Sequence, residues 1–200
     1  LLPCDDPEWS NFTRYFAQNF ELLGLKKLIS TSYANDKKSI VFVQLSLFEQ
    51  ESPKFDKNKT NSHGKIFTLD RDTNKSGRID INDLEWDYLK GDGDFRSDEV
   101  KKLRDEADII ITNPPFSLFR EFLSWLIESG KQFIIIGNEN DATTKETFPL
   151  VRDGVMWLGK NAGDMSFKVP KDSEPRETRF WIDEKGQKWR SMGNICWYTN

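Results

Sequence analysis

Apolar residues recur at helical spacing in three parts of the chain. In the segment Ser10–Gly24 they fall on one face, which predicts a helix with the serine as its N-cap and the glycine as its stop. The segment Ser117–Gly130 shows the same arrangement of capping serine, apolar stripe and terminal glycine. A shorter helix is predicted over Ser97–Arg104, again from a serine cap.

Short β-type runs alternate with these helices. The runs Asp108–Thr112 and Phe133–Gly137 are almost entirely aliphatic and flank the helix that follows Ser117. Such runs are typical of parallel strands that are covered on both faces. We therefore predict an α/β protein of the Rossmann-like type, with a mainly parallel, doubly wound sheet and an inserted small subdomain. Further strands are expected at 1–3, 26–31, 40–48, 66–69, 155–158, 178–182 and 195–198.

The middle of the chain differs in composition from the segments on either side of it. Polar and charged residues dominate 35–38 and 54–65, and β-rich segments lie between and after them. We therefore expect residues 35–95 to form an insertion with its own small sheet and a helix over Ile81–Leu89. Residues 1–34 would be the start of the main domain, with its N-terminus truncated. Residues 96–200 would be the rest of that domain, with a recognition domain largely absent.

Composition excludes several classes of protein. Apolar residues make up 36% of the 200 residues and aromatic residues 13%, which is too much for a wholly disordered chain. The longest aliphatic runs have three residues, so no membrane span is expected. The net charge of −4 argues mildly against a protein that coats nucleic acid, although a local basic groove would still bind it. Two distant cysteines, Cys4 and Cys196, suggest a reduced, cytoplasmic protein.

The tetrapeptide Asn113-Pro114-Pro115-Phe116 carries the most specific chemical signal. It follows the aliphatic run 108–112 directly, and ligands of doubly wound sheets bind at the carboxyl ends of strands. Two consecutive prolines fix two φ angles and remove two N–H donors. The result is a rigid elbow that offers the Asn113 side-chain oxygen and the Pro114 carbonyl as acceptors, beside an aromatic ring. This arrangement suits a planar amino group on a flat π system. The alternative is that the motif only ends a strand and starts a helix.

Four segments together resemble a known family. They are PCDDPEWSNF at 3–12, GDGDFRS at 91–97, NPPFSLFREF at 113–122 and IIGNEN at 135–140. In this order they are similar to the EcoRI-type adenine-specific DNA methyltransferases, whose catalytic motif resembles the elbow. The resemblance implies that the Rossmann-like fold is that of a class I methyltransferase. It also implies transfer of a methyl group from S-adenosylmethionine to adenine N6 in double-stranded DNA. It also implies a restriction–modification setting, with a possible cognate restriction endonuclease that acts on the same DNA site.

The resemblance assigns roles to the elbow that agree with its local chemistry. Asn113 and Pro114 would accept the two N6 hydrogens, and this favours a pyramidal, charge-developing transition state over the planar ground state. The adenine would have to leave the duplex. Phe116 would stack on the flipped base. Phe167 is a candidate for a second ring against that base, although packing in the core is an equal alternative.

The cofactor site is expected at the first loop and helix. Methyltransferases usually carry a glycine-rich loop there, whereas this chain has Cys4, Asp5 and Asp6. Either carboxylate would hold the cationic amino group of the cofactor. The free N–H groups at Ser10 and Asn11, where the helix begins, would bind its carboxylate. The alternative for residues 4–6 is a plain capped turn.

Two further cofactor contacts are expected. Asp94 and Phe95 resemble the loop that reads the adenine of S-adenosylmethionine, with the carboxylate accepting from the amino group and the ring packing on the base. A carboxylate for the ribose is missing after the strand 26–31, and Tyr33 or Asp36 would have to replace it. A structural loop without contact to the cofactor is the alternative for residues 94 and 95.

The insertion contains a pattern similar to a calcium-binding loop. Oxygen ligands fall at the expected positions around a turn glycine, although the last ligand is a short aspartate and the preceding segment is β-like. A structural Ca²⁺ ion is one interpretation, and an Asx-rich turn before a helix is the other. The candidate ligands are Asp72, Asn74, Ser76, Arg78 through its carbonyl, Asp80 and Asp83.

Two other functions remain open from the sequence. One is an amino methyltransferase that acts on protein glutamine or on RNA, because glutamine-modifying enzymes carry a similar motif and the net charge is negative. The other is a non-catalytic calcium-binding or interaction module built around the insertion.

Overall fold

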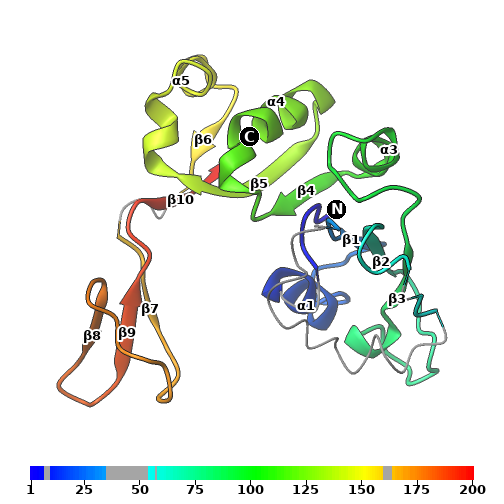
Figure 1. The fold of residues 1–200 in the computed structure, drawn as a ribbon, viewed down its shortest axis with the longest axis horizontal. Coiled ribbons are helices and arrows are strands. Elements are labelled where there is room, and N and C mark those ends of the chain that lie inside the picture. The colour runs from blue at the N-terminus through cyan, green and yellow to red at the C-terminus, as the bar shows by residue number, and fades with distance from the viewer. Residues whose placement is uncertain (7–9, 35–53, 57, 160–163) are drawn as a thin grey trace.

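The computed structural model of the chain describes residues 1–6, 10–34, 54–56, 58–159 and 164–200. Figure 1 shows a body of strands and helices from which an arm of three strands extends. The strand expected at 40–48 lies outside the described residues. No helix within the described residues is long and apolar enough to cross a membrane.

Helices and strands alternate along most of the described chain. The helices are α1 (Asn11–Gln18), α3 (Asp98–Glu106), α4 (Phe119–Ser129) and α5 (Phe148–Arg152), with 3-10 turns η2 (Ile81–Asp83), η3 (Phe116–Leu118) and η4 (Glu139–Thr143). The strands are β1 (Leu28–Thr31), β2 (Lys65–Leu69), β3 (Glu85–Tyr88), β4 (Ile109–Thr112), β5 (Gln132–Asn138), β6 (Trp157–Leu158), β7 (Ser166–Lys168), β8 (Phe180–Ile182), β9 (Lys188–Ser191) and β10 (Ile195–Thr199).

The strands form three sheets, and most neighbouring strands are antiparallel. One sheet has the order β1-β2-β3, the second β4-β5-β10-β6, and the third β7-β9-β8. Strands β4 and β5 pair in parallel, whereas β10 pairs antiparallel with both β5 and β6. The protein is therefore of the α/β class with mixed sheets.

The first two residues connect two of these sheets. Leu2 forms a parallel bridge with Ser30, through hydrogen bonds to Ile29 and from Thr31 of β1. On its other side, the amino group of Leu1 donates to the carbonyl of Ile109 (2.8 Å), and the carbonyl of Leu1 accepts from the N–H of Ile111 (2.9 Å). This is the hydrogen-bond pattern of parallel strands. Leu1 and Leu2 therefore run between β1 and β4 and align the carboxyl ends of all three segments.

Helices cover the central strands on two sides. Helices α3 and α4 pack their apolar residues onto the face that carries Ile110, Phe133 and Tyr198, and these side chains are almost wholly buried. Helix α1 packs against Leu2 and β1 in a second cluster that also includes Leu69. Figure 1 shows α4 and α1 on opposite sides of the β4 region.

Several helix ends follow the sequence prediction. Ser10 caps α1 by accepting a hydrogen bond from the N–H of Phe12, and Ser97 caps α3 by accepting from Val100. Gly130 ends α4 in the left-handed conformation, with a φ of 64°. The expected cap at Ser117 is wrong. A 3-10 turn precedes α4, and Leu118 occupies the cap position without a side-chain hydrogen bond.

The helix predicted over Ile81–Leu89 is also wrong. Only η2 is helical there, and β3 follows it at once. Strand β3 pairs with β2, which itself pairs with β1. Pairing with a neighbouring strand overrides the local helix signal. The described strands of the insertion therefore extend the sheet of β1 and do not form a separate sheet, while the limits 35 and 95 stay a prediction.

Candidate active site

The elbow 113–116 lies at the carboxyl end of β4, between that strand and η3. Asn113 is exposed, whereas Pro114 is buried and anchors the turn. Leu118 donates a backbone hydrogen bond to the carbonyl of Pro115 (2.9 Å), which starts the 3-10 turn. The Phe116 side chain is 50% exposed. The structure thus exposes Asn113 and, three residues later in the chain, the half-exposed ring of Phe116.

A cavity of about 470 Å³ opens beside Asn113. It lies where the parallel segments end, because Cys4 follows the Leu1–Leu2 segment, Ser32 follows β1 and Asn113 follows β4. Ligands of α/β sheets bind at this edge. The residues that line it are Cys4, Asp6, Ser32, Tyr33, Gly93, Asp94, Phe95, Arg96, Asn113, Pro115, Ser117 and Leu118.

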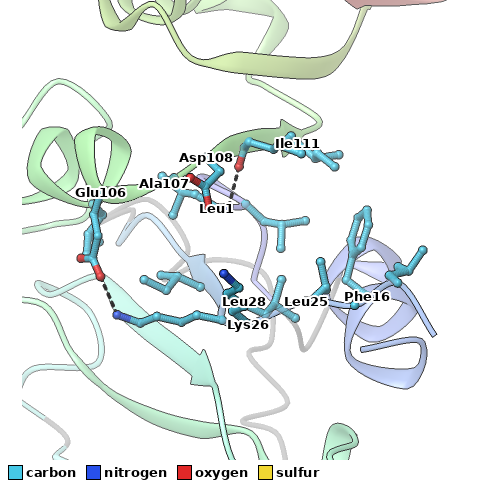
Figure 2. Close-up of a pocket in the computed structure, with 16 residues that line it drawn as sticks. Leu1, Phe16, Leu25, Lys26, Leu28, Glu106, Ala107, Asp108 and Ile111 are labelled. Carbon is cyan, nitrogen blue, oxygen red and sulfur yellow. Dashed lines mark hydrogen bonds and ion pairs between the residues drawn. The ribbon is translucent and has the colours of Figure 1, made fainter. Parts of the chain in front are cut away.

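A second cavity, of about 390 Å³, lies at the opposite, amino-terminal ends of the same strands. Figure 2 shows its apolar walls, which include Leu1, Phe16 and Ile111. An ion pair between Lys27 and Glu106 (2.8 Å) lies beside it. None of the predicted site residues lines this cavity. The cavity beside Asn113, which gathers predicted residues from three segments, is therefore the candidate active site.

The two carboxylates of the first loop, Asp5 and Asp6, have different surroundings. Asp6 lines the cavity, whereas the side chain of Asp5 points into the protein and is only 3% exposed. Cys4 turns the chain with a φ of 67°, a conformation that glycine adopts at lower cost. Burial, together with the nearby charges of Asp5 and Asp94, raises the pKa of the Cys4 thiol to about 12. The thiol is therefore protonated and uncharged at neutral pH.

Asp5 joins the start of α1 to the end of β4. Its Oδ1 accepts from the hydroxyl of Ser10 (2.8 Å), and its Oδ2 accepts from the hydroxyl of Thr112 (2.5 Å). The backbone of Asn113, directly after Thr112, lies near enough to lower the pKa of this carboxylate as well. Burial raises the pKa of Asp5 to about 6, against the lowering effect of these three neighbours. Ser10 and Asn11 do not line the cavity. The Ser10 hydroxyl bonds to the carboxylate of Asp5 and caps its own helix.

Asp94 lines the cavity and forms an ion pair with Arg96, whose guanidinium donates to both carboxylate oxygens. Phe95 also lines the cavity, but its side chain is 3% exposed and contacts Phe122 and Trp125 edge to face. Tyr33 lines the cavity and is 45% exposed. The other candidate for the ribose contact, Asp36, lies outside the described residues.

The loop that carries Asp94 is tied closely to the end of β1. The N–H of Ala34 donates to the carbonyl of Asp92 in that loop (2.7 Å), and the N–H of Ser32 donates to the carbonyl of Lys65 in the adjacent strand β2 (2.9 Å). At Gly93 the φ is +83°, and a Cβ atom there would fall well inside van der Waals distance of the Ser32 carbonyl oxygen. Glycine is therefore required at this position for two wall segments of the cavity to meet.

Phe167 lies on β7, in the three-stranded arm, and its side chain is 48% exposed. It is not among the residues that line the cavity. It pairs across the strands with Arg190 of β9, which in turn pairs with Phe180 of β8. The exposure of Phe167 shows that it is not a core residue, while its role toward a base stays a prediction.

The loop 72–83 forms a network of hydrogen bonds to its own backbone. Asp83 accepts from the N–H groups of Thr73, Asn74 and Asp80 and from the hydroxyl of Thr73, at 2.8–3.1 Å. Asp72 accepts from the N–H groups of Ser76 and Gly77. Within the described residues, no three His, Cys, Asp or Glu side chains are grouped so that they could hold a metal ion. This geometry favours the Asx-rich turn over the calcium site.

Sequence reasoning missed three features of the site. Thr112 reads as the last residue of a strand, yet its hydroxyl contacts both the carbonyl of Pro3 and the carboxylate of Asp5. From the sequence, Arg96 has no role beyond that of a surface cation, but in the structure it forms an ion pair with Asp94. Its position two residues after Asp94 was the signal for this local pair. Ser117, which was expected to cap a helix, lines the cavity.

Comparison with known proteins gives three curated relatives and one family. The sequence profile of the family described as adenine-specific methyltransferase EcoRI matches residues 1–200. The type II methyltransferase M.EcoRI of Escherichia coli is 39% identical over 199 residues, which are 98% of this chain and 56% of that protein. M.MgeORF184P of Mycoplasma genitalium is 31% identical over 98% of the chain and 52% of its own length. M.MpnI of Mycoplasma pneumoniae is 29% identical over 100% of the chain and 53% of its own length.

The chain thus spans about half the length of the curated relatives it matches. No solved structure matches the chain.

Proposed function

The chain belongs to the EcoRI-type adenine-specific methyltransferase family, and we propose that its natural protein methylates N6 of adenine in double-stranded DNA. The methyl donor in this proposal is S-adenosylmethionine, in keeping with the methyltransferase family. One observation carries the proposal. The exposed amide of Asn113 lies at the wall of a cavity at the carboxyl ends of parallel segments, where a cofactor and a base can meet.

The residues of the cavity fit this cofactor. Its volume of about 470 Å³ is within the range of small-molecule sites, roughly 300–1,000 Å³. Asp6 would hold the cationic amino group, since Asp5 is turned away from the cavity. Asp94, oriented by Arg96, would accept from the adenine amino group, and Tyr33 would contact the ribose. When bound, the cofactor supplies a methyl group that is activated by the adjacent positive charge on sulfur.

The elbow would act on the base that receives the methyl group. The N6 lone pair is delocalised into the ring in the ground state, which makes it a weak nucleophile. Asn113 Oδ1 and the Pro114 carbonyl would accept the two N6 hydrogens and favour a pyramidal nitrogen, whose lone pair is available for attack. Positive charge develops on N6 as the new bond forms, and the two acceptor dipoles stabilise that charge. One N6 proton then leaves to solvent.

Phe116 would hold a base outside the duplex in this proposal. Enzymes that modify a base must extrude it from the stack, and an aromatic side chain compensates part of the lost stacking. Base stacking on an aromatic ring is worth about 1–3 kcal/mol in single-strand binding proteins. The half-exposed ring of Phe116 follows directly on the acceptors of the elbow. Phe167, at the exposed surface of the arm, is the candidate for a second contact with DNA.

The arrangement of the strands supports a Rossmann-like organisation of this domain. The Leu1–Leu2 segment runs parallel to β1 and β4, and β5 continues the parallel series. The crossover from β4 to β5 passes through α4, as in a βαβ unit. In this proposal the antiparallel strand β10 follows β5 in the doubly wound sheet, and β6 forms the edge beyond it.

A restriction endonuclease with the same DNA site is the proposed biological partner. The relatives are named type II methyltransferases, and such a protein would protect host DNA from its endonuclease. The proposal predicts that DNA methylated by this protein resists one sequence-specific endonuclease.

A labelled-cofactor assay tests the proposed function. The complete natural polypeptide is incubated with tritiated S-adenosylmethionine and, in separate reactions, with unmethylated genomic DNA, total RNA or a protein extract. We expect label in duplex DNA, as N6-methyladenine after digestion. Label in RNA or in protein glutamine, with none in DNA, would instead establish the rival amino methyltransferase.

A further inference from the structure

Asp5 is a buried carboxylate that the proposed reaction does not use directly. Its neighbours Cys4 and Asp6 line the cavity, but Asp5 itself is 3% exposed and turned into the protein. Burial of a carboxylate is unfavourable unless hydrogen bonds compensate for the lost water. The hydrogen-bond partners that offset the burial of Asp5 therefore indicate the structural role of this residue.

The two side-chain hydrogen bonds to the carboxylate come from both sides of the site. The hydroxyl of Thr112, at the end of β4 and directly before Asn113, lies 2.5 Å from Oδ2. Ser10, the cap of α1, donates to Oδ1. Asp5 thus holds the residue on which the elbow begins, and the backbone of Asn113 lies near enough to lower the pKa of the carboxylate.

The backbone of Asp5 is fixed as well. Its carbonyl accepts from the hydroxyl of Ser30 in β1, and the Thr13 hydroxyl of α1 lies 3.3 Å from the same carbonyl and 2.9 Å from the Ser30 hydroxyl. Thr13 and Ser30 are fully buried. The residue therefore joins α1, β1 and β4 and is itself held in place by two of them.

We propose that the Asp5 carboxylate is a positioning residue that fixes Asn113 relative to the cofactor cavity. The inference rests on the proposed function, because it assigns Asn113 to the reacting base. The required form is the ionised one. An ionised carboxylate is an acceptor only, and it accepts from the hydroxyls of Ser10 and Thr112. The Thr112 hydroxyl has a single hydrogen and also contacts the carbonyl of Pro3. Protonation of Asp5 would turn that hydrogen toward Pro3 and remove the charge from the bond to Thr112, so the elbow would lose part of its support.

The surroundings of Asp5 define the pH range of this effect. The groups that face it from α1, β1 and β4 are the uncharged hydroxyls of Ser10, Thr13, Ser30 and Thr112 and the Asn113 amide. The titratable groups nearby are the Cys4 thiol, which stays protonated, and the adjacent Asp6, with Asp94 beyond Cys4. Burial raises the pKa of Asp5 to about 6. The elbow should thus loosen as the pH falls through about 6.

The experiment combines a measurement that needs no activity with one that does. Hydrogen exchange is followed by mass spectrometry in peptides that cover 109–118, in the complete polypeptide, at several pH values and with correction for intrinsic exchange rates. Methyl transfer to unmethylated genomic DNA gives kcat and KM over the same pH range. The variants are Asp5→Asn, Thr112→Val as a milder change on the elbow side, and Asp87→Asn as a matched change at an exposed carboxylate.

In the wild type we expect the peptide 109–118 to be protected at pH 7 and to lose protection below about pH 6, with kcat falling in parallel. Asp5→Asn should lose protection at every pH and lower kcat by roughly 100-fold, the scale of loss for a reacting group misplaced by about 1 Å. Its KM and its affinity for S-adenosylhomocysteine should change little. The decrease of kcat below about pH 6, the acid limb of the pH profile, should disappear in this variant. Thr112→Val should show the same changes more weakly, and Asp87→Asn none.

The inference is overturned if Asp5→Asn keeps the protection, the kcat and the acid limb of the wild type. If that variant does not fold, wild-type exchange that is independent of pH, or a Thr112→Val variant that behaves like the wild type, overturns it equally. A wild-type protein that methylates no DNA would instead refute the proposed function, and the exchange measurement would still decide whether Asp5 holds the elbow.

Discussion

Arg96 donates to both carboxylate oxygens of Asp94, with 2.9 Å from Nε to Oδ1 and 2.6 Å from an Nη atom to Oδ2. The ion pair lowers the pKa of Asp94, mainly through the side-chain hydrogen bond from Arg96. The carboxylate at the cavity wall is therefore ionised at all physiological pH values, and its orientation is fixed before any ligand binds.

Replacing Arg96 should weaken cofactor binding without unfolding the protein. In Arg96→Gln the carboxylate of Asp94 loses its bidentate partner and is free to rotate, and we expect roughly a tenfold loss of affinity for S-adenosylhomocysteine, or about 1.4 kcal/mol. Calorimetric titration measures it. The matched control is Arg152→Gln, which breaks an equivalent pair with Asp153 away from the cavity. Equal affinity in the two variants would contradict a role for Asp94 in the cofactor site.

Removing the Asn113 amide should abolish methyl transfer and spare the cofactor. Loss of one preorganised polar group in a transition-state site costs about 10²–10³ in kcat in an acyl-transfer enzyme, and we expect at least that for Asn113→Ala. Tritium incorporation into DNA measures the rate, and calorimetry with S-adenosylhomocysteine measures the binding. Asn58→Ala, at another exposed asparagine, serves as the control. Turnover equal to that of the wild type would remove Asn113 from the mechanism.

A methyl group at Gly93 should disrupt the wall of the cavity. In Gly93→Ala the new Cβ would collide with the Ser32 carbonyl, in addition to the strain of a positive φ. Gly77→Ala is a matched control, because Gly77 has a φ of +85° with open space around it. The strain alone costs about 1–3 kcal/mol. Thermal unfolding should therefore show a larger loss for Gly93→Ala than for Gly77→Ala, and only the former should weaken S-adenosylhomocysteine binding.

The turn 72–83 should depend on the charge of Asp83 and not on calcium. Four hydrogen bonds from neighbouring groups lower the pKa of Asp83, so its stabilisation is present above the ordinary aspartate pKa and is lost as the pH falls through the lower native value. Asp83→Asn should therefore lower Tm at pH 7, and the difference from the wild type should shrink in acid. Excess Ca²⁺ should leave the wild-type Tm unchanged. A clear rise in Tm with Ca²⁺ would instead support calcium binding by this turn.

Local signals in the sequence predicted several helix ends but not all, because α1 ends at Gln18 and not at the expected Gly24, and Ser117 is not a cap. Ser10 and Ser97 are helix caps, and Gly130 ends α4, because caps and left-handed glycines depend on a few neighbouring atoms. The position of the elbow after β4 also follows from the aliphatic run that precedes it.

Features that depend on distant partners were not visible in the sequence. The segment 81–89 contains a strand because β2 lies beside it, and β10 runs antiparallel because of its place next to β5. The two adjacent carboxylates of the first loop look alike in the sequence. The buried Asp5 is bound by the hydroxyl of Ser10 and by that of Thr112, which is more than a hundred residues away, whereas Asp6 lines the cavity.

The insertion of Leu1 and Leu2 between β1 and β4 sets an order for assembly. Their partners on one side come from residues 109–111, so the centre of the sheet cannot close until more than half of these 200 residues have been synthesised. Contacts between positions so far apart slow folding, since a long loop must be ordered first. On the ribosome, the backbone groups of Leu1 that face β4 should therefore stay unpaired until that strand has emerged, whereas the apolar partners of α1, such as Leu2 and Leu28, are already in the chain.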